Sequence, residues 1–71
     1  MPRLPRVSGA EVIRALQRMG FEKARQSGSH VVMRRGSMGC VVPLHHELKT
    51  GTLAGLLRQA EVSAEDFAAN L

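Results

Sequence analysis

The apolar residues of this 71-residue chain change their spacing twice, and this change limits the folds open to it. Between residues 8 and 20 they recur every three or four positions, as on one face of a helix. Between residues 21 and 43, β-branched residues gather in short segments separated by glycine and serine, as in strands joined by tight turns. From residue 50 the helical spacing returns. This order predicts an α+β fold, a two-layer sandwich of helices and an antiparallel sheet.

The first helix carries its own start and stop signals. Ser8 and Glu11 have the spacing of a capping box, which satisfies two otherwise unpaired backbone N–H groups. Gly20 predicts a left-handed residue at the helix end, after which Phe21 contacts Leu16 in a Schellman arrangement. The predicted buried stripe consists of Val12, Ile13, Leu16 and Met19.

Short segments rich in β-branched residues, divided by glycine and serine, predict three short strands. We expect them at residues 21–26, 30–35 and 40–43. In the middle strand Val31 and Met33 share one face, and His30, Val32 and Arg34 share the other. Because a charged Arg34 belongs in water, this pattern predicts that His30 also lies on the open face of the sheet.

The sequence after the strands predicts two more helices, and the first six residues predict an N-terminal arm. Thr50 or Thr52 is expected to cap a second helix, and Ser63, with Asp66 at the reciprocal capping position, begins a short third one. The apolar stripe of the second helix consists of Leu53, Leu56, Leu57 and Ala60. We expect one domain over residues 1–71, with residues 1–6 as a flexible basic arm.

Positive charge is concentrated in the first part of the chain. Residues 1–51 carry nine basic and three acidic groups, a net +6, whereas residues 52–71 carry a net −2. This asymmetry indicates an anionic partner, with nucleic acid the first candidate, although a solvated basic surface explains the charge equally well. The aromatic residues are Phe21 and Phe67, and both have structural roles. Contacts to nucleic acid are therefore expected through phosphates and shape rather than base stacking.

Several classes of protein are excluded by simple features. The longest apolar run, residues 40–44, is too short to span a membrane, and the N-terminus has no apolar export segment. The single cysteine cannot form an internal disulfide, so a reducing cytoplasm is expected. Cys40, His45 and His46 lack the paired spacings of zinc sites. We expect no metal and no cofactor, and a buried, inert Cys40.

Four ordered motifs closely resemble the HicA toxin family of bacterial toxin–antitoxin systems. The resemblance extends from Ser8 to Phe67. The motifs are Met19-Gly20-Phe21, Arg25-Gln26-Ser27-Gly28-Ser29-His30, Val42-Pro43-Leu44-His45 and Leu48-Lys49-Thr50-Gly51-Thr52-Leu53.

This resemblance implies a fold, an activity and a partner. The fold is like that of double-stranded-RNA-binding domains, in the order α-β-β-β-α, and the activity is ribosome-independent cleavage of messenger RNA. The family's catalytic histidine falls on His30, and an antitoxin of the HicB type covers the active face. Two positions depart from the family: Val31 replaces a second histidine, and Glu61 replaces a glycine, so we expect the second helix to end differently.

Histidine suits RNA cleavage because its ordinary pKa near 6.5 lets it accept or donate protons at neutral pH. Spacing alone favours reading His30 as an ordinary exposed histidine at a strand end, and the family resemblance reverses this preference. His45 can assist or simply bond to its own loop, and Ser29 can orient His30 or complete a turn, which we favour. The remaining candidates for RNA binding are Gly28, through close approach, and the cations Arg25, Arg34, Arg35 and Lys49.

Two other classes of function remain open. One is a module that binds double-stranded RNA without cleaving it, although Lys49 alone stands where such modules carry several lysines. The other is an adaptor whose basic surface binds an acidic protein. The leading hypothesis is a toxin ribonuclease that is a monomer alone and a hetero-oligomer with its antitoxin.

Overall fold

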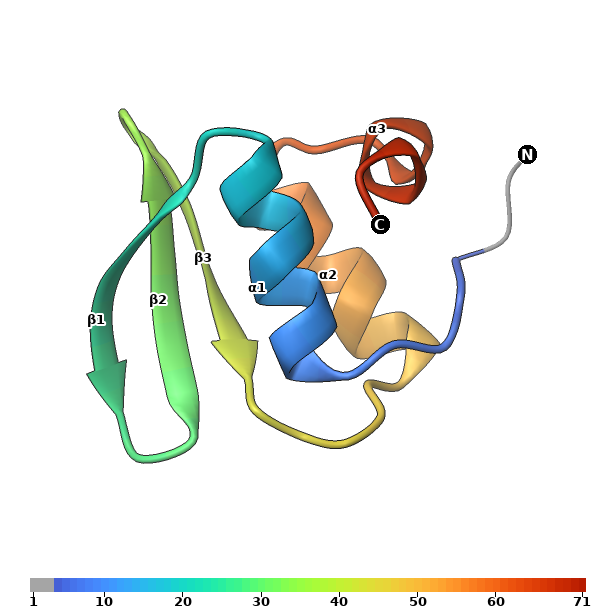
Figure 1. Ribbon diagram of the computed structural model, residues 1–71, viewed down its shortest axis with the longest axis horizontal. Helices are drawn as coiled ribbons and strands as arrows, with labels where there is room; N and C mark the ends of the chain where they lie inside the picture. Colours follow the sequence, from blue (N-terminus) through green and yellow to red (C-terminus); the bar gives the residue numbers. More distant parts are fainter. Residues whose placement is uncertain (1–3) are drawn as a thin grey trace.

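The computed structural model describes residues 4–71 and has the predicted order of elements (Figure 1). The elements are α1 (Gly9–Arg18), β1 (Glu22–Ser27), β2 (His30–Arg35), β3 (Met38–Pro43), α2 (Thr50–Ala60) and α3 (Ala64–Ala69). This α-β-β-β-α order with a further C-terminal helix confirms the α+β fold. Residues 1–3 of the predicted arm lie outside the described residues, whereas Leu4 packs against the core.

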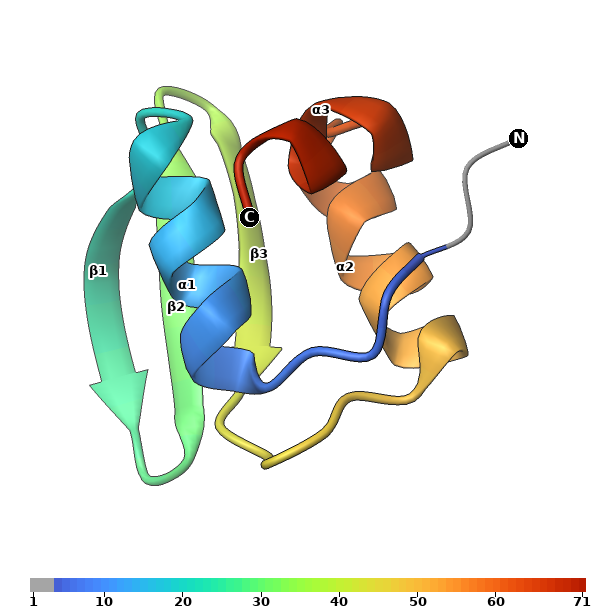
Figure 2. The same cartoon turned by 45° about the vertical axis from the view of Figure 1, so that its right-hand side comes forward.

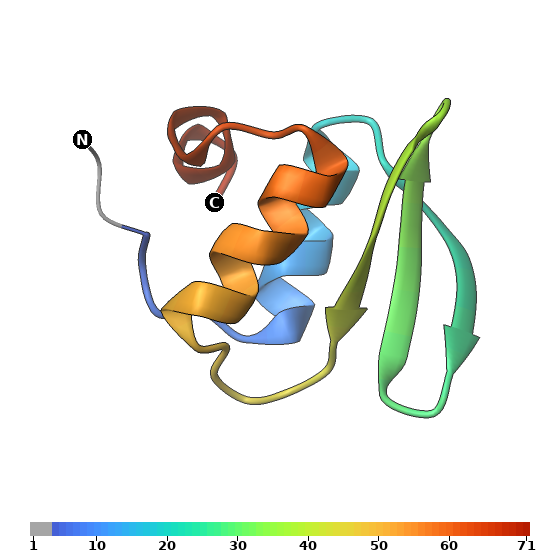
Figure 3. The same ribbon diagram turned by 180° about the vertical axis from the view of Figure 1, so that it is seen from behind.

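The sheet is antiparallel, with strand order β1-β2-β3, and the helices lie on one side of it. Figures 1 and 3 show α1 and α2 side by side on that side, and Figure 2 shows α1 in front of β1 and β2 with α2 beside β3. No helix among residues 4–71 covers the other side, which we call the open face.

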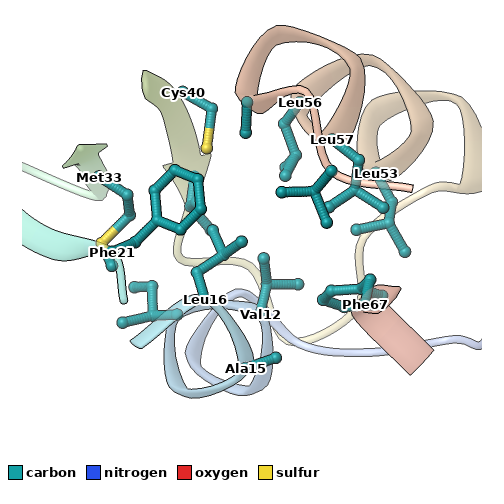
Figure 4. Packing of buried hydrophobic residues seen from close by; sticks show 14 of the residues in the cluster. Val12, Ala15, Leu16, Phe21, Met33, Cys40, Leu53, Leu56, Leu57 and Phe67 are labelled. Carbon is teal, nitrogen blue, oxygen red and sulfur yellow. The ribbon is translucent and has the colours of Figure 1, made fainter. Parts of the chain in front are cut away.

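The core fills the space between sheet and helices because each element contributes one apolar face. Val31 and Met33 of β2 point inward, with 0% of their surface exposed, as their alternation predicted. Figure 4 shows Phe21 between the sheet and α1, and Phe67 of α3 close to Leu53 of α2. The core also contains Val7, Val12, Ile13, Ala15, Leu16, Cys40, Val42, Leu48, Leu56, Leu57, Ala60 and Val62.

The predicted capping of α1 is confirmed at both ends. The Glu11 amide donates to Ser8 Oγ at 3.1 Å, and the Ser8 amide donates to Glu11 Oε1 at 2.9 Å. The second of these bonds is the main cause that lowers the pKa of the Glu11 carboxyl. The bond from the Ser8 amide to the Glu11 carboxylate therefore stabilises the fold fully at pH values above the ordinary pKa of glutamate. This stabilisation is lost as the pH falls through the lowered pKa of Glu11. At the other end Gly20 has a φ of 94°, and the Phe21 amide donates to the Leu16 carbonyl at 2.9 Å.

The start of α2 differs from the prediction. The residue preceding the helix is Lys49, with no side-chain cap, so the predictions for Thr50 and Thr52 are wrong. Thr50 is already the first helical residue, because the chain leaves the loop one residue earlier than a threonine cap requires. Lys49 therefore stands directly at an uncapped helix N-terminus. For α3, Ser63 Oγ accepts from the Asp66 amide at 3.1 Å, as predicted.

The end of α2 corrects another expectation. Glu61 adopts the left-handed conformation itself, with a φ of 56°, and the Val62 amide donates to the Leu57 carbonyl at 2.9 Å. The helix thus closes in the way that a glycine would allow, rather than differently. A residue with a Cβ atom is strained there, by about 1–2 kcal/mol.

Replacing Glu61 with glycine is therefore expected to stabilise the protein. The gain should be about 0.5–1 kcal/mol, because relief of the left-handed strain is partly offset by the greater freedom of glycine in the unfolded chain. Equilibrium unfolding in urea measures it, and Glu61→Ala, which keeps the Cβ atom, is the control. An equal or lower midpoint for Glu61→Gly would contradict the assignment of strain to this residue.

Candidate functional site

The open face of the sheet brings three of the predicted site residues together. Residues that pair directly across an antiparallel sheet point to the same side. Arg25 pairs with Val32, and His30 pairs with Ser27 on one side and with Pro43 on the other. The prediction that His30 and Arg34 share the open face is confirmed, since both are exposed while Val31 and Met33 are buried. Arg25 joins them from β1.

The turn before His30 has a backbone that only glycine adopts readily. Gly28 has a φ of 59° and, with Ser29, forms a two-residue connection between β1 and β2. The Gln26 side-chain amide donates to the Gly28 carbonyl at 3.1 Å. A Cβ atom on Gly28 would have no neighbour within 4 Å, so the turn leaves open space beside His30.

The loop between β3 and α2 is attached to this turn by its backbone. The Leu44 amide donates to the Ser29 carbonyl at 2.7 Å, so Ser29 acts through its main chain, as the turn reading expects. The His45 carbonyl accepts from the Gly9 amide at 2.9 Å at the start of α1. Figure 1 shows the β1–β2 turn, this loop and the start of α1 at the same end of the molecule. His45 therefore lies in a loop that is bonded to the turn before His30, and its side chain is exposed.

Gly9 makes this attachment possible, and the sequence reasoning missed it. A Cβ atom on Gly9 would lie 2.1 Å from the Pro43 carbonyl oxygen and 2.9 Å from Leu44 Cα. The loop can therefore rest on α1 only where no side chain stands. The available signal was a poor helix former at the first position of a well-capped helix.

Lys49 lies apart from the other candidates. It lines a surface recess of about 240 Å³ with Arg6, Glu47, Leu48 and Thr50, at the start of α2. Arg6 Nη1 and Glu47 Oε2 are 3.9 Å apart across this recess, and both side chains are largely exposed. Lys49 thus provides a positive charge at the start of α2, separate from the residues of the open face.

Arg35 lies apart from the other predicted phosphate-binding residues and makes contacts within the protein. Its side chain alternates with that of Arg34 and therefore leaves the sheet on the helix side. Arg35 Nη1 donates to the Met19 carbonyl at 2.8 Å, and the guanidinium lies 4.7 Å from the centre of the Phe21 ring. These contacts bind the β2–β3 turn to the end of α1, which is a structural role.

Cys40, His45 and His46 form neither a metal site nor a reactive thiol site in the described part of the chain. Burial raises the pKa of the Cys40 thiol to about 11, so the group stays protonated and unreactive at neutral pH, as predicted. Residues 4–71 hold no cluster of histidine, cysteine and carboxylate side chains able to bind a metal ion. None of the described helices is long and apolar enough to span a membrane.

A hollow beside the edge strand β3 was also missed by the sequence reasoning. It has a volume of about 330 Å³ and lies between β2, β3 and the side of α2. We call it the sheet recess, and it is lined by Val32, Arg34, Ser37, Gly39, Cys40, Val41 and Gln59. Gln59 comes from α2, and no local pattern in the sequence places it beside β2.

The site thus combines an exposed imidazole, cationic side chains and a glycine turn on an uncovered sheet face, which suits a ligand with an anionic backbone. Comparison with curated proteins gives no significant match. Comparison with family models gives a match to the HicA toxin of bacterial toxin–antitoxin systems over residues 9–62, which includes the whole sheet, the loop and α2. The chain therefore belongs to the HicA toxin family.

Proposed function

We propose that this toxin is an endoribonuclease that cleaves messenger RNA without a metal ion, with His30 as general acid or base. The observation that carries the proposal is the exposed His30 imidazole on the open face, at the start of the central strand. The family match includes this residue, and resemblance assigns the catalytic histidine to it.

RNA supplies its own nucleophile in this reaction. The ribose 2′-hydroxyl attacks the adjacent phosphorus and gives its proton to a base, while the bond to the 5′-oxygen breaks and that oxygen takes a proton from an acid. The products are a 2′,3′-cyclic phosphate and a 5′-hydroxyl. An imidazole can fill either role near neutral pH. Since the nucleophile is internal, this chemistry requires no metal-bound water.

Cationic side chains on the same face support the proposal. The ion pair found among residues 4–71 joins Arg6 and Glu47, so Arg25 and Arg34 are not engaged with a carboxylate. Glu22 pairs with Arg34 across the sheet without forming such a contact. We assign Arg25 and Arg34 to phosphates near the cut bond and Lys49 to a more distant phosphate. Gly28 and Ser29 give the RNA backbone room to approach His30, and His45 assists from the neighbouring loop.

An antitoxin of the HicB type is the proposed protein partner. The net charge of +6 on residues 1–51 favours an acidic partner surface, and the open face offers one continuous area to cover. Covering it would exclude RNA from His30. We propose that the toxin alone is a monomer and acts in the cytoplasm, where messenger RNA is translated.

Production of the toxin without its partner tests the proposal. Growth arrest and loss of messenger RNA are expected on induction. The purified chain should cut RNA in the presence of EDTA and leave 2′,3′-cyclic phosphate ends. RNA that binds but stays intact, with and without added divalent ions, would instead favour the non-catalytic RNA-binding module.

A further inference from the structure

We propose that the sheet recess is a nucleobase subsite, which binds the base of an unpaired nucleotide next to the bond that is cut. The proposal rests on the proposed ribonuclease function and adds to it a source of sequence preference. It also departs from the expectation that contacts to nucleic acid are made through phosphates and shape rather than base stacking.

The recess has the size and openness that a base requires. Its volume is about 330 Å³, within the usual range for small-molecule sites, and its lining includes Val32 and Arg34, which share one face of β2 with His30. Val41 is 44% exposed, and its neighbour across the strands is Val32. Two adjacent valines thus form an apolar floor that is accessible to solvent.

The polar groups around this floor match the two other features of a base, its flat face and its polar edge. Arg34 has a planar guanidinium, whose face can stack on a base while its edge N–H groups donate to the neighbouring phosphate. The Gln59 side chain carries a donor and an acceptor, and no described residue hydrogen-bonds to it. A glutamine amide of this kind can read the edge of a base by paired hydrogen bonds.

The position of the recess relative to His30 explains why a neighbouring nucleotide would fill it. His30, Val32 and Arg34 follow one another on the same face of β2, at intervals of about 7 Å. Arg25, which pairs with Val32, stands on the other side of this row. A backbone held between Arg25 and His30 can therefore direct one base toward β3 and α2, which lie beside each other in Figure 2 and both line the recess.

A protein partner would also use an exposed apolar area. The observations favour a base because the floor is small, is bordered by a guanidinium and an unbonded amide, and lies in line with the imidazole. An acidic protein surface would pair with Arg34 but would leave the Gln59 amide without a specific role.

The first experiment measures binding separately from cleavage. The His30→Ala variant, in which cleavage is expected to be about 10²- to 10⁴-fold slower, is titrated with trinucleotides of a single base (A, C, G or U) and followed by NMR. The Val41 methyl and Gln59 side-chain amide signals should shift most, and more for one base than for the others. The amide of Gln17, which is exposed on α1 outside the recess, is the internal control. Equal shifts for all bases, or none at the recess, would overturn the proposal.

The second experiment measures preference during cleavage. Cut sites of the wild type, Gln59→Ala, Val41→Ser and Gln17→Ala are mapped on a pool of random RNA. Gln59→Ala should reduce the discrimination between bases beside the cut by about tenfold, whereas Gln17→Ala should leave it unchanged. An unchanged preference in Gln59→Ala and Val41→Ser, with cleavage intact, would refute the subsite and leave the ribonuclease proposal standing. Base-selective shifts without cleavage by the wild type would support the subsite and refute the ribonuclease proposal.

Discussion

Replacing His30 with alanine should abolish growth arrest and lower the rate of RNA cleavage by about 10²- to 10⁴-fold, the usual contribution of a general acid or base. The fold should be retained, because the side chain is exposed at the beginning of a strand and buries no apolar surface. RNA affinity should also remain, because Arg25, Arg34 and Lys49 are still in place. Single-turnover cleavage of a labelled RNA, together with a binding titration, separates these effects.

His46→Ala is the matched control for this experiment. His46 is an exposed histidine in the loop after β3 and has no assigned role, so its loss should leave cleavage unchanged. Cleavage by His30→Ala at the rate of the wild type would remove the histidine from the mechanism. In that event the toxin would act through another group or another target.

Replacing Gly9 with alanine should destabilise the protein, although alanine is the better helix former. At an open helical position the exchange gains about 1 kcal/mol. Here the new Cβ atom would lie 2.1 Å from the Pro43 carbonyl oxygen, so the loop must move and its bond to the Gly9 amide is strained or lost. We expect a net loss of about 2–3 kcal/mol, which lowers the melting temperature by roughly 10 °C or more in a domain of this size.

Gly55→Ala is the matched glycine-to-alanine exchange, and it is expected to stabilise the protein rather than destabilise it. Gly55 lies in α2, and a Cβ atom there would meet nothing within 4 Å. Its replacement should raise stability by about 0.5–1 kcal/mol. Thermal and urea unfolding of the two variants compares them directly. If Gly9→Ala were as stable as Gly55→Ala, the close approach of the loop to α1 would not constrain the fold.

Gly9→Ala should also lower the rate of RNA cleavage. The loop that rests on Gly9 also bonds to Ser29, immediately before His30. A displaced loop therefore disturbs the turn that positions the imidazole. The folded fraction of Gly9→Ala, measured below its melting temperature, should cleave RNA more slowly than the wild type.

Local patterns in the sequence determined the elements and the side of the sheet on which each residue lies. The Ser8–Glu11 box and Gly20 define the first helix, because capping depends on residues within one turn. The alternation of Val31 and Met33 with His30 and Arg34 assigned the buried and open faces, because side chains alternate along any strand. The four motifs also identified the family.

Contacts between distant segments were decided by the tertiary structure alone. From the sequence, Arg35 is indistinguishable from other surface cations, but the structure places Met19 and Phe21 beside it. In the same way Gly9 is only a weak helix former in the sequence, but the structure places the Pro43 carbonyl against it. Gln59 meets the sheet recess only because α2 packs beside β3. Each of these contacts joins residues far apart in the chain, and no spacing rule records them, because they depend on how the layers pack rather than on neighbouring residues.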